Sequence, residues 1–231
     1  MEHITFAEKA FRKMVDPWGR AFIPKKFQPY IKEYFFKAGI YEIPYRLHGV
    51  LFYIAAALTA FTYLGFIMGS LPWQGTSGAI ISMVLTLVIW SVLHLLYFTM
   101  VDSAVYFYIN LRIYNRTKEL EARLPDYLTL VSTNLKGGLS FEKSLWAAIK
   151  PEFGVLANEI ALVSKKVLTG SDVSEAMMEF GDKYDSPVLR RSINLMVGEM
   201  DSGGRIVDVI DKIIETLKKT KHLKDEMAAN T

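Results

Sequence analysis

The sequence contains no cysteine, which excludes disulfide bonds and thiolate metal sites. Histidine is also scarce, and His3, His48, His94 and His222 are not spaced to share a metal ion. No set of Ser, His and Asp residues stands out as a hydrolytic centre, and no segment alternates apolar and polar residues over the length of a strand. Neither an enzyme nor a β-sheet is therefore expected.

Residues 47–101 lack Asp, Glu, Lys and Arg altogether, which is the most informative absence in the chain. A single membrane helix needs about 20 apolar residues, so this stretch is long enough for two. Proline and glycine interrupt it within residues 70–78, as they do between helices. The pattern predicts a transmembrane hairpin with helices at about 48–69 and 78–101 and a turn at 70–77.

The charges that flank the hairpin predict its orientation. Residues 1–46 carry nine Lys or Arg and five Asp or Glu, whereas the turn carries none. Positive residues favour the cytoplasmic side, so both termini are expected in the cytoplasm and the turn outside. The segment before the first apolar run is too long for the basic region of a signal peptide, so this run is expected to be a retained anchor. The chain is thus predicted to be a multi-pass protein of the cell membrane.

The N-terminal segment, residues 1–46, is both basic and rich in aromatic residues. Such a composition suits a segment that lies at the level of the lipid headgroups. It equally suits a short helix packed on the protein's own cytoplasmic domain, because amphipathicity does not identify the surface that is bound. Both interpretations stay open, and membrane lipid is an expected partner.

Beyond the hairpin the apolar pattern becomes helical. Residues 102–123 are expected to extend the second span as a helix, because charges enter there at helical spacing. Residues 124–231 then contain several short helices, whose starts are marked by the N-cap residues Ser140 and Asp172 and by Pro187 at a first helical position. The predicted fold is an all-α membrane protein, with a two-helix transmembrane hairpin plus a cytoplasmic six-helix bundle.

The glycines between the predicted helices leave a second architecture open. Gly138, Gly170 and Gly204 each open a similar phrase, at spacings of 32 and 34 residues. That spacing is the length of a helical hairpin in solenoid proteins. Two weak copies support a solenoid less well than they support a single bundle.

A near match to a phosphate-binding loop lies at residues 137–144. The Walker pattern requires a second glycine before Lys and Ser, and Glu142 stands in that place before Lys143 and Ser144. A carboxylate there would repel phosphate, and no strand precedes the loop. Nucleotide binding is therefore not expected, and nucleic acid is not an expected partner.

Two other polar features have functional and structural interpretations. His48 and His94 lie beside or within the predicted spans, but no intramembrane carboxylate accompanies them, so structural hydrogen bonds are favoured over a proton relay. Glu199 and Asp201 could bind a divalent cation through carboxylate oxygens. A solvated helix end explains the same pair more simply, so no cofactor is expected.

A set of short phrases occurs in order along the C-terminal half of the chain. They are Leu124-Pro125, Leu135-Lys136-Gly137-Gly138-Leu139-Ser140, Ser144-Leu145, Glu159, Gly170, Ala176, Pro187 and Glu199-Met200-Asp201-Ser202-Gly203-Gly204. Together they resemble the type II secretion F family, whose cytoplasmic unit carries a Gly-Leu-Ser phrase and a later Glu-x-x-Ser-Gly phrase. The resemblance covers about residues 35–227, since residues 37–44 also look like the segment before the first span in the archaellum and tight-adherence branches.

The resemblance implies a platform protein of a type II secretion system, a type IV pilus or an archaellum, without enzymatic activity. It implies two protein partners, a hexameric cytoplasmic ATPase and the pilin or archaellin subunits in the membrane, and a homo-oligomeric state. The positions that match the family motif or its turns are Gly137, Gly138, Ser140, Gly170, Pro187, Glu199, Gly203 and Gly204. The charged candidates for contacts with the ATPase are Lys143, Arg190, Arg191 and Asp201, together with Glu199.

Relatives in this family commonly carry a second cytoplasmic unit and further spans. The chain is therefore expected to be a fragment or one half of a split pair. A different class of protein stays open beside the platform, namely a membrane-anchored helical adaptor or signalling scaffold, which needs only the hairpin and a helical bundle. Neighbouring genes for a secretion ATPase and prepilins would favour the platform.

Overall fold

A computed structural model describes Val15, Pro17 and residues 25–40, 45–71, 74–202 and 205–229. Every regular element in these ranges is a helix, so the predicted all-α class is confirmed for this part of the chain. The chain divides into two compact units, Met1–Arg112 and Ile113–Thr231, and one helix, α4, contributes residues to both. Each unit is described by itself.

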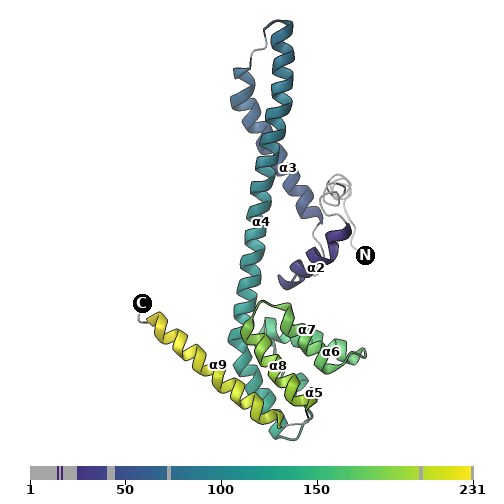
Figure 1. Cartoon of the computed structure of the whole chain (residues 1–231), viewed down its shortest axis with the longest axis vertical. Coiled ribbons are helices and arrows are strands. Elements are labelled where there is room, and N and C mark those ends of the chain that lie inside the picture. The colour runs from purple at the N-terminus through teal and green to yellow at the C-terminus, as the bar shows by residue number, and fades with distance from the viewer. Residues whose placement is uncertain are drawn as a thin grey trace. The chain divides into compact units, whose positions relative to one another are not determined.

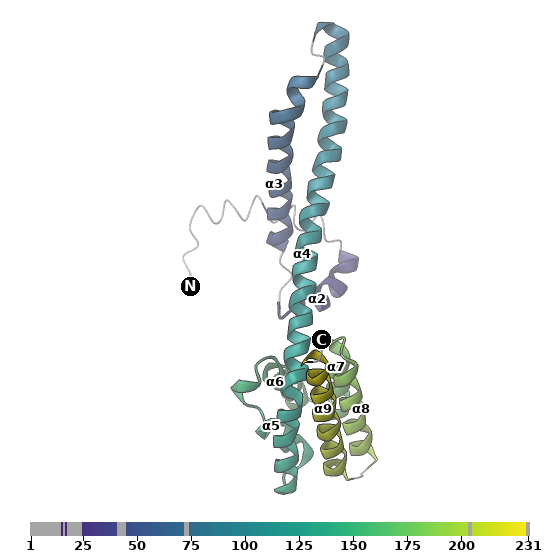
Figure 2. The same ribbon diagram turned by 90° about the vertical axis from the view of Figure 1, so that its left-hand side faces the viewer.

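The first unit contains two long apolar helices at the places where the uncharged stretch predicts them. Its elements are η1 (Lys25–Phe27), α2 (Gln28–Lys37), α3 (Tyr45–Thr62), the π-helical turn η2 (Tyr63–Ile67), the 3₁₀ turn η3 (Met68–Ser70) and the N-terminal part of α4 (Gly75–Lys136). By length and composition, the helical stretch Tyr45–Ser70 and α4 could each cross a membrane. Figures 1 and 2 show α3 lying beside α4.

Polar side chains link these two apolar helices along their length. The Thr62 hydroxyl lies 2.9 Å from the Tyr97 hydroxyl, and the Tyr63 hydroxyl lies 2.6 Å from Thr86 Oγ1. His94 takes part as well, because its Nδ1 lies 3.5 Å from the hydroxyl of the buried Thr59. Inter-helix hydrogen bonds of this kind stabilise helix pairs where water is absent. The geometry therefore agrees with the structural interpretation of His94.

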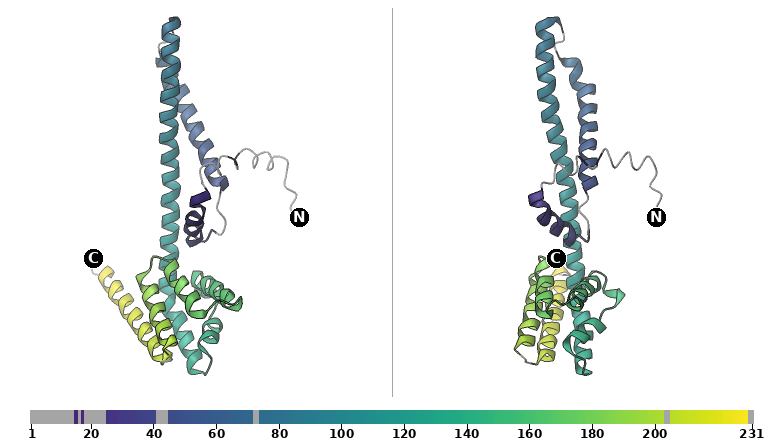
Figure 3. Two further views of the ribbon diagram at one scale, coloured as in Figure 1. Left: turned by 45° about the vertical axis from the view of Figure 1, so that its right-hand side comes forward. Right: turned by 90° about the vertical axis from the view of Figure 1, so that its right-hand side faces the viewer.

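The second unit packs short helices against the C-terminal part of α4. Its elements are α5 (Phe141–Ala147), η4 (Pro151–Phe153), α6 (Val155–Leu168), α7 (Val173–Lys183), α8 (Pro187–Asp201) and α9 (Ile206–Ala229). Figure 3 shows α8 and α9 as neighbours. The cytoplasmic location of this unit and its description as a six-helix bundle stay predictions.

The core of the second unit lies against one stripe of α4. Leu120, Leu124, Leu128 and Val131 are all almost fully buried, and their spacing places them on one face of the helix. They pack in one apolar cluster with residues of α5 to α9. α4 continues without a break through Pro125, so the predicted boundary between residues 123 and 124 falls inside a helix.

Long-range contacts in this unit do not fit the solenoid alternative. On α9, Asp211 accepts a hydrogen bond from Ser132 on α4 at 2.6 Å, and a second from Lys136 at 2.8 Å. In a solenoid each repeat contacts only its neighbours, so the last helix would not return to the first. The chain instead closes on itself around a single core.

Three helices begin where the sequence predicts capping residues. A side-chain oxygen accepts a hydrogen bond from the first-turn amide in each case: Ser140 from Lys143 at 3.4 Å, Asp172 from Glu175 at 3.1 Å, and Ser186 from Leu189 at 3.1 Å. Each bond satisfies one of the amides that a helix start leaves without a partner. Pro187 occupies the first helical position after Ser186, where its missing N–H costs nothing.

Gly154, between η4 and α6, has a backbone conformation and a close contact that leave no room for a side chain. Its φ is +52°, and a Cβ at this position would overlap Oε1 of Glu119. The same oxygen accepts a hydrogen bond from the Val155 amide at 3.3 Å, so Glu119 of α4 caps the start of α6. Only a residue without a side chain lets the two helices approach in this way.

We expect Gly154→Ala to lower the free energy of unfolding by about 2 kcal/mol or more, through backbone strain and loss of the Glu119 cap. The matched control is Gly198→Ala within α8, where an added Cβ meets nothing within 4 Å. That change should be neutral or stabilising by about 0.5–1 kcal/mol, because alanine favours a helix over glycine. Thermal unfolding of the full chain in detergent micelles, followed by circular dichroism, measures both. Equal shifts for the two variants would contradict the requirement for glycine at position 154.

Candidate functional site

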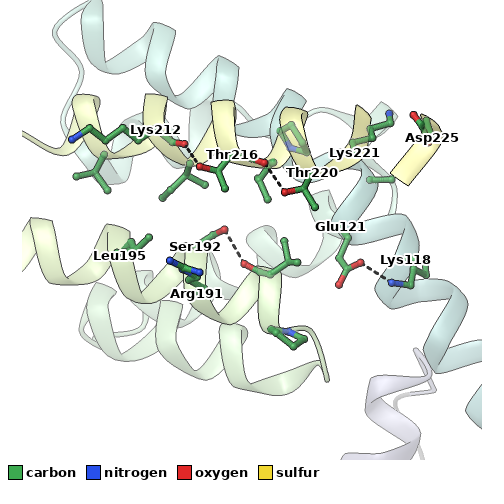
Figure 4. A pocket seen from close by; sticks show the side chains of 17 residues that line it. Lys118, Glu121, Arg191, Ser192, Leu195, Lys212, Thr216, Thr220, Lys221 and Asp225 are labelled. Carbon is green, nitrogen blue, oxygen red and sulfur yellow. Dashed lines mark hydrogen bonds and ion pairs between the residues drawn. The ribbon is translucent and has the colours of Figure 1, made fainter. Parts of the chain in front are cut away.

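A groove of about 880 Å³ lies in the second unit between α4, α8 and α9 (Figure 4). Each helix lines it with residues at positions i, i+3, i+4 and i+7, which form one helix face. These are Lys118, Glu121, Ala122 and Pro125 on α4; Val188, Arg191, Ser192 and Leu195 on α8; and Val209, Lys212, Ile213 and Thr216 on α9. The groove is thus built from helix faces that the core leaves uncovered.

The groove combines an apolar surface with charged edges that carry an excess of positive charge. Its basic lining residues are Lys118, Arg191, Lys212 and Lys221, and its acidic ones are Glu121 and Asp225. Four cations against two anions leave a formal charge of +2. Such a surface suits a partner that presents apolar side chains together with acidic ones.

Glu121 holds one edge of the groove in place. Its Oε1 accepts a hydrogen bond from the Ser186 hydroxyl at 2.7 Å, which ties α4 to the start of α8. Its Oε2 lies 3.0 Å from Lys118 Nζ. The hydrogen bond to Glu121 raises the pKa of Lys118, so this lysine stays charged at the groove edge.

A buried ion cluster lies elsewhere in the second unit, around Glu159 of α6. Glu159 is only 3% exposed. Lys183 Nζ lies 2.7 Å from its Oε2, while the Tyr184 hydroxyl donates to Oε1 at 2.6 Å and Arg116 Nη2 lies 3.5 Å from the same atom. The cluster therefore joins α4, α6 and the end of α7 around one carboxylate.

The cluster is held by electrostatics in a poorly solvated place. Burial lowers the pKa of Lys183, and the hydrogen bond and charge of Glu159 oppose that shift. Burial, together with the charge of Glu159, raises the pKa of the Tyr184 hydroxyl, which stays a hydrogen-bond donor. Arg116 Nε is buried without a hydrogen-bond partner among the described residues. The arrangement is suited to fixing three helices together rather than to proton transfer.

The structure places the predicted contact residues at separate positions. Lys143 is exposed on α5, and Arg190 is exposed on α8 with its Nε 2.8 Å from Asp182 Oδ1. Arg191 is the member of the set that lines the groove. Glu199 is half-buried about 12 Å further along α8. These side chains therefore do not gather at one point.

The predicted motif glycines fall between helices. Gly137 directly follows α4, Gly138 has φ of +88° in the turn before Ser140, and Gly170 has φ of +105° after α6. The side chain of Asp201 lies outside the described residues, as do Gly203 and Gly204, so the cation predicted near Glu199 and Asp201 stays a prediction. In the described ranges no three His, Asp or Glu side chains form a group that could hold a metal ion.

Sequence reasoning missed both the groove and the partners of Glu159. One signal for the buried cluster was present, because Glu159 stands on the same helix face as Leu156, Ile160 and Val163. A charged residue in an apolar stripe requires a buried partner. Arg116 and Lys183, however, lie 43 and 24 residues away in the sequence, and no local pattern connects them to Glu159.

Comparison with known proteins finds a family match for the C-terminal part of the chain. Residues 127–231 match the family model described as type II secretion system (T2SS), protein F. No curated protein and no solved structure gives a significant match. The matched segment includes the end of α4 and all of α5 to α9, and so it contains most residues of the groove. This family comprises inner-membrane platform proteins of secretion or pilus-assembly machinery, which are generally not enzymes.

We expect Glu159→Gln to lower the free energy of unfolding by about 3 kcal/mol, because it leaves two poorly solvated cations without their anion. The control is Glu179→Gln, which removes the exposed partner of Lys166 and should cost less than about 1 kcal/mol. Thermal unfolding of the full chain in detergent compares the two. A shift for Glu159→Gln no larger than that of the control would contradict a structural role of the cluster.

The contact of Asp211 with α4 predicts a dependence of stability on pH. The hydrogen bond from Lys136, aided by that from Ser132, lowers the pKa of Asp211. A carboxylate with a lowered folded-state pKa stabilises the fold above its unfolded pKa, and this contribution is lost as pH falls through the folded pKa. The wild-type chain should therefore be more stable than Asp211→Asn at pH 7, with a difference that shrinks below about pH 4. Melting temperatures of both proteins between pH 3 and 7 test this, and a difference that is independent of pH would refute it.

Proposed function

We propose, from the match of residues 127–231 to the family model of type II secretion system protein F, that this chain is a non-enzymatic platform of a type IV pilus, archaellum or type II secretion machine. The platform couples a cytoplasmic assembly ATPase to pilin subunits in the membrane. One observation carries the proposal: the family domain is preceded, in the same chain, by two helices that are long and apolar enough to span a membrane.

The groove is the surface we assign to the ATPase. Its lining combines apolar side chains with an excess of positive ones, and it lies within or next to the segment that matches the family model. An amphipathic helix with acidic flanks fits such a surface, because apolar contacts supply affinity while charge complementarity sets the orientation. Arg191 and Lys212 stand on its two sides, on α8 and α9 respectively.

In this proposal α4 transmits a force applied at the groove to the membrane. It lines the groove with Lys118, Glu121 and Ala122, and the same helix extends back to Gly75 through the apolar span. In this proposal both termini lie in the cytoplasm, and the platform works as a homo-oligomer.

The proposal is tested with the full chain in lipid nanodiscs and the purified ATPase encoded beside it. We expect direct binding, and we expect Arg191→Glu to weaken it about tenfold or more, by placing a negative charge on the groove edge. The matched control is Arg190→Glu, which makes the same charge change one residue away, outside the groove, and should alter affinity less than about twofold.

Two results would count against the proposal at different levels. If Arg191→Glu binds as tightly as the wild type, the groove is not the docking surface. If the stable wild-type chain does not bind the ATPase at all, the adaptor or scaffold becomes the better interpretation.

A further inference from the structure

The exposed apolar surface of α4 continues beyond the predicted end of the second span at Val101. Phe107 and Tyr108 are 71% and 62% exposed, and Leu111 is 47% exposed. Apart from Asp102, residues 102–111 contain no charge, and the first cation is Arg112. Three large side chains exposed side by side on one helix indicate a surface that another molecule covers.

A contact between the two apolar helices marks the level of this surface. At the start of α3, His48 Nε2 lies 3.9 Å from Oδ1 of Asp102 on α4. This polar pair places the cytoplasmic end of the apolar hairpin at Asp102. Tyr106 and Asn110 then lie about 6 and 12 Å further along α4. The headgroup layer on each side of a bilayer is about 5–7 Å thick, so Tyr106 lies within this layer and Asn110 lies beyond it on the water side.

The helix α2 is docked on α4 at this same level. The Tyr34 hydroxyl donates a hydrogen bond to Asn110 Oδ1 at 2.9 Å, and its ring stacks on Tyr106 with centroids 5.8 Å apart. Phe35, the next residue, is buried. These contacts hold α2, a short helix, against the segment of α4 that follows the span.

The exposed side chains of η1 and α2 combine aromatic and basic groups. Phe27 and Tyr30 are 52% and 73% exposed, and Lys26 and Lys32 are exposed beside them. Residues 25–37 hold four lysines and a single acid, Glu33, which lies 2.9 Å from Lys37. Aromatic rings with a positive excess are complementary to the interface of an anionic membrane.

We propose that η1, α2 and residues 106–112 of α4 form a collar that binds the headgroups of anionic phospholipids in the cytoplasmic leaflet. Lys26, Lys32 and Arg112 extend their long side chains toward the phosphates, while Tyr30, Phe107 and Tyr108 lie at the outer part of the headgroup layer. The proposal rests on the hairpin spanning a bilayer and is independent of ATPase binding, so either can fail without the other. The collar fixes the depth at which the hairpin lies in the bilayer, and this depth then depends on lipid composition.

The first experiment measures lipid selectivity of the full chain reconstituted in phosphatidylcholine, with spin-labelled phosphatidylglycerol or phosphatidylcholine as the probe. We expect the wild type to prefer the anionic probe by about threefold or more at low salt, with the preference lost near 1 M NaCl. The variant Lys26→Gln/Lys32→Gln/Arg112→Gln should show almost equal association of both probes. The matched control, Lys143→Gln/Lys165→Gln/Lys218→Gln, removes three exposed cations of the second unit and should keep the wild-type preference.

The second experiment measures depth and does not depend on the charged residues. The chain has no cysteine, so a single nitroxide can be attached through Tyr108→Cys, with Lys143→Cys as the reference in water. Relative collision rates with oxygen and a water-soluble nickel complex should place the label at Tyr108 in the headgroup layer. Circular dichroism must show unchanged helix content for every variant compared.

Three outcomes would overturn the proposal. Equal association of both probes with the wild type would show that the collar is not selective for anionic lipid. An unchanged preference in the collar triple variant would place the selectivity elsewhere. A label at Tyr108 that is fully accessible to water would show that the surface is left for a protein partner.

Discussion

A single helix, α4, carries two different patterns of apolar side chains, and the rest of the structure depends on both. Between residues 79 and 101 large apolar side chains are exposed around much of its circumference. From Leu120 onward the buried side chains narrow to one stripe. Hydrocarbon accepts apolar groups on every face of a helix, whereas water confines them to the face that packs on a core. Residues 102–116 are where one pattern changes into the other.

The second unit combines an apolar core with a charge that the fold must satisfy. Apolar packing alone tolerates rearrangement, because many combinations of similar volume fill the same space. Glu159 adds directional contacts to Arg116, Lys183 and Tyr184, and these are made only when α4, α6 and α7 meet in one arrangement. We infer that the cluster favours this one arrangement of α4, α6 and α7 over other packings of the same apolar core. Its net contribution to stability is small in comparison with the cost of removing its anion.

Each of the helices α8 and α9 has two apolar faces, and the core covers only one of them. On α8, Leu189, Ile193 and Met196 are buried, while Val188 and Leu195 line the groove. α9 buries Ile210 in the same core and presents Val209 and Leu217 to the groove. A helix that is apolar on two faces and covered on one is suited to receive a partner. The positive edges of the groove then restrict which partner fits.

The sequence by itself determined the helical class, the positions of the two apolar helices and the helix starts at Ser140, Asp172 and Pro187. These features depend on local physics, since charge is excluded from hydrocarbon and an orphan amide is satisfied by a side chain three residues away. The resemblance to the type II secretion F family also came from local phrases, whose order and spacing can be read without knowledge of the fold. The sequence likewise pointed to Arg191 as a charged candidate, although not to the groove that it lines.

Only the tertiary structure decided which separated residues meet. The partners of Glu159 lie 24 to 43 residues away, Asp211 returns to α4 across more than 70 residues, and Tyr34 docks on Asn110 across 76. The groove likewise needs three helices from distant parts of the chain. Periodicity shows that a helix has an apolar face but not which surface covers it, because that choice is made by packing among all the helices at once. For the same reason, the composition of the basic, aromatic N-terminal segment did not decide between its two interpretations. The packing of α2 against α4 is a feature of the tertiary structure alone.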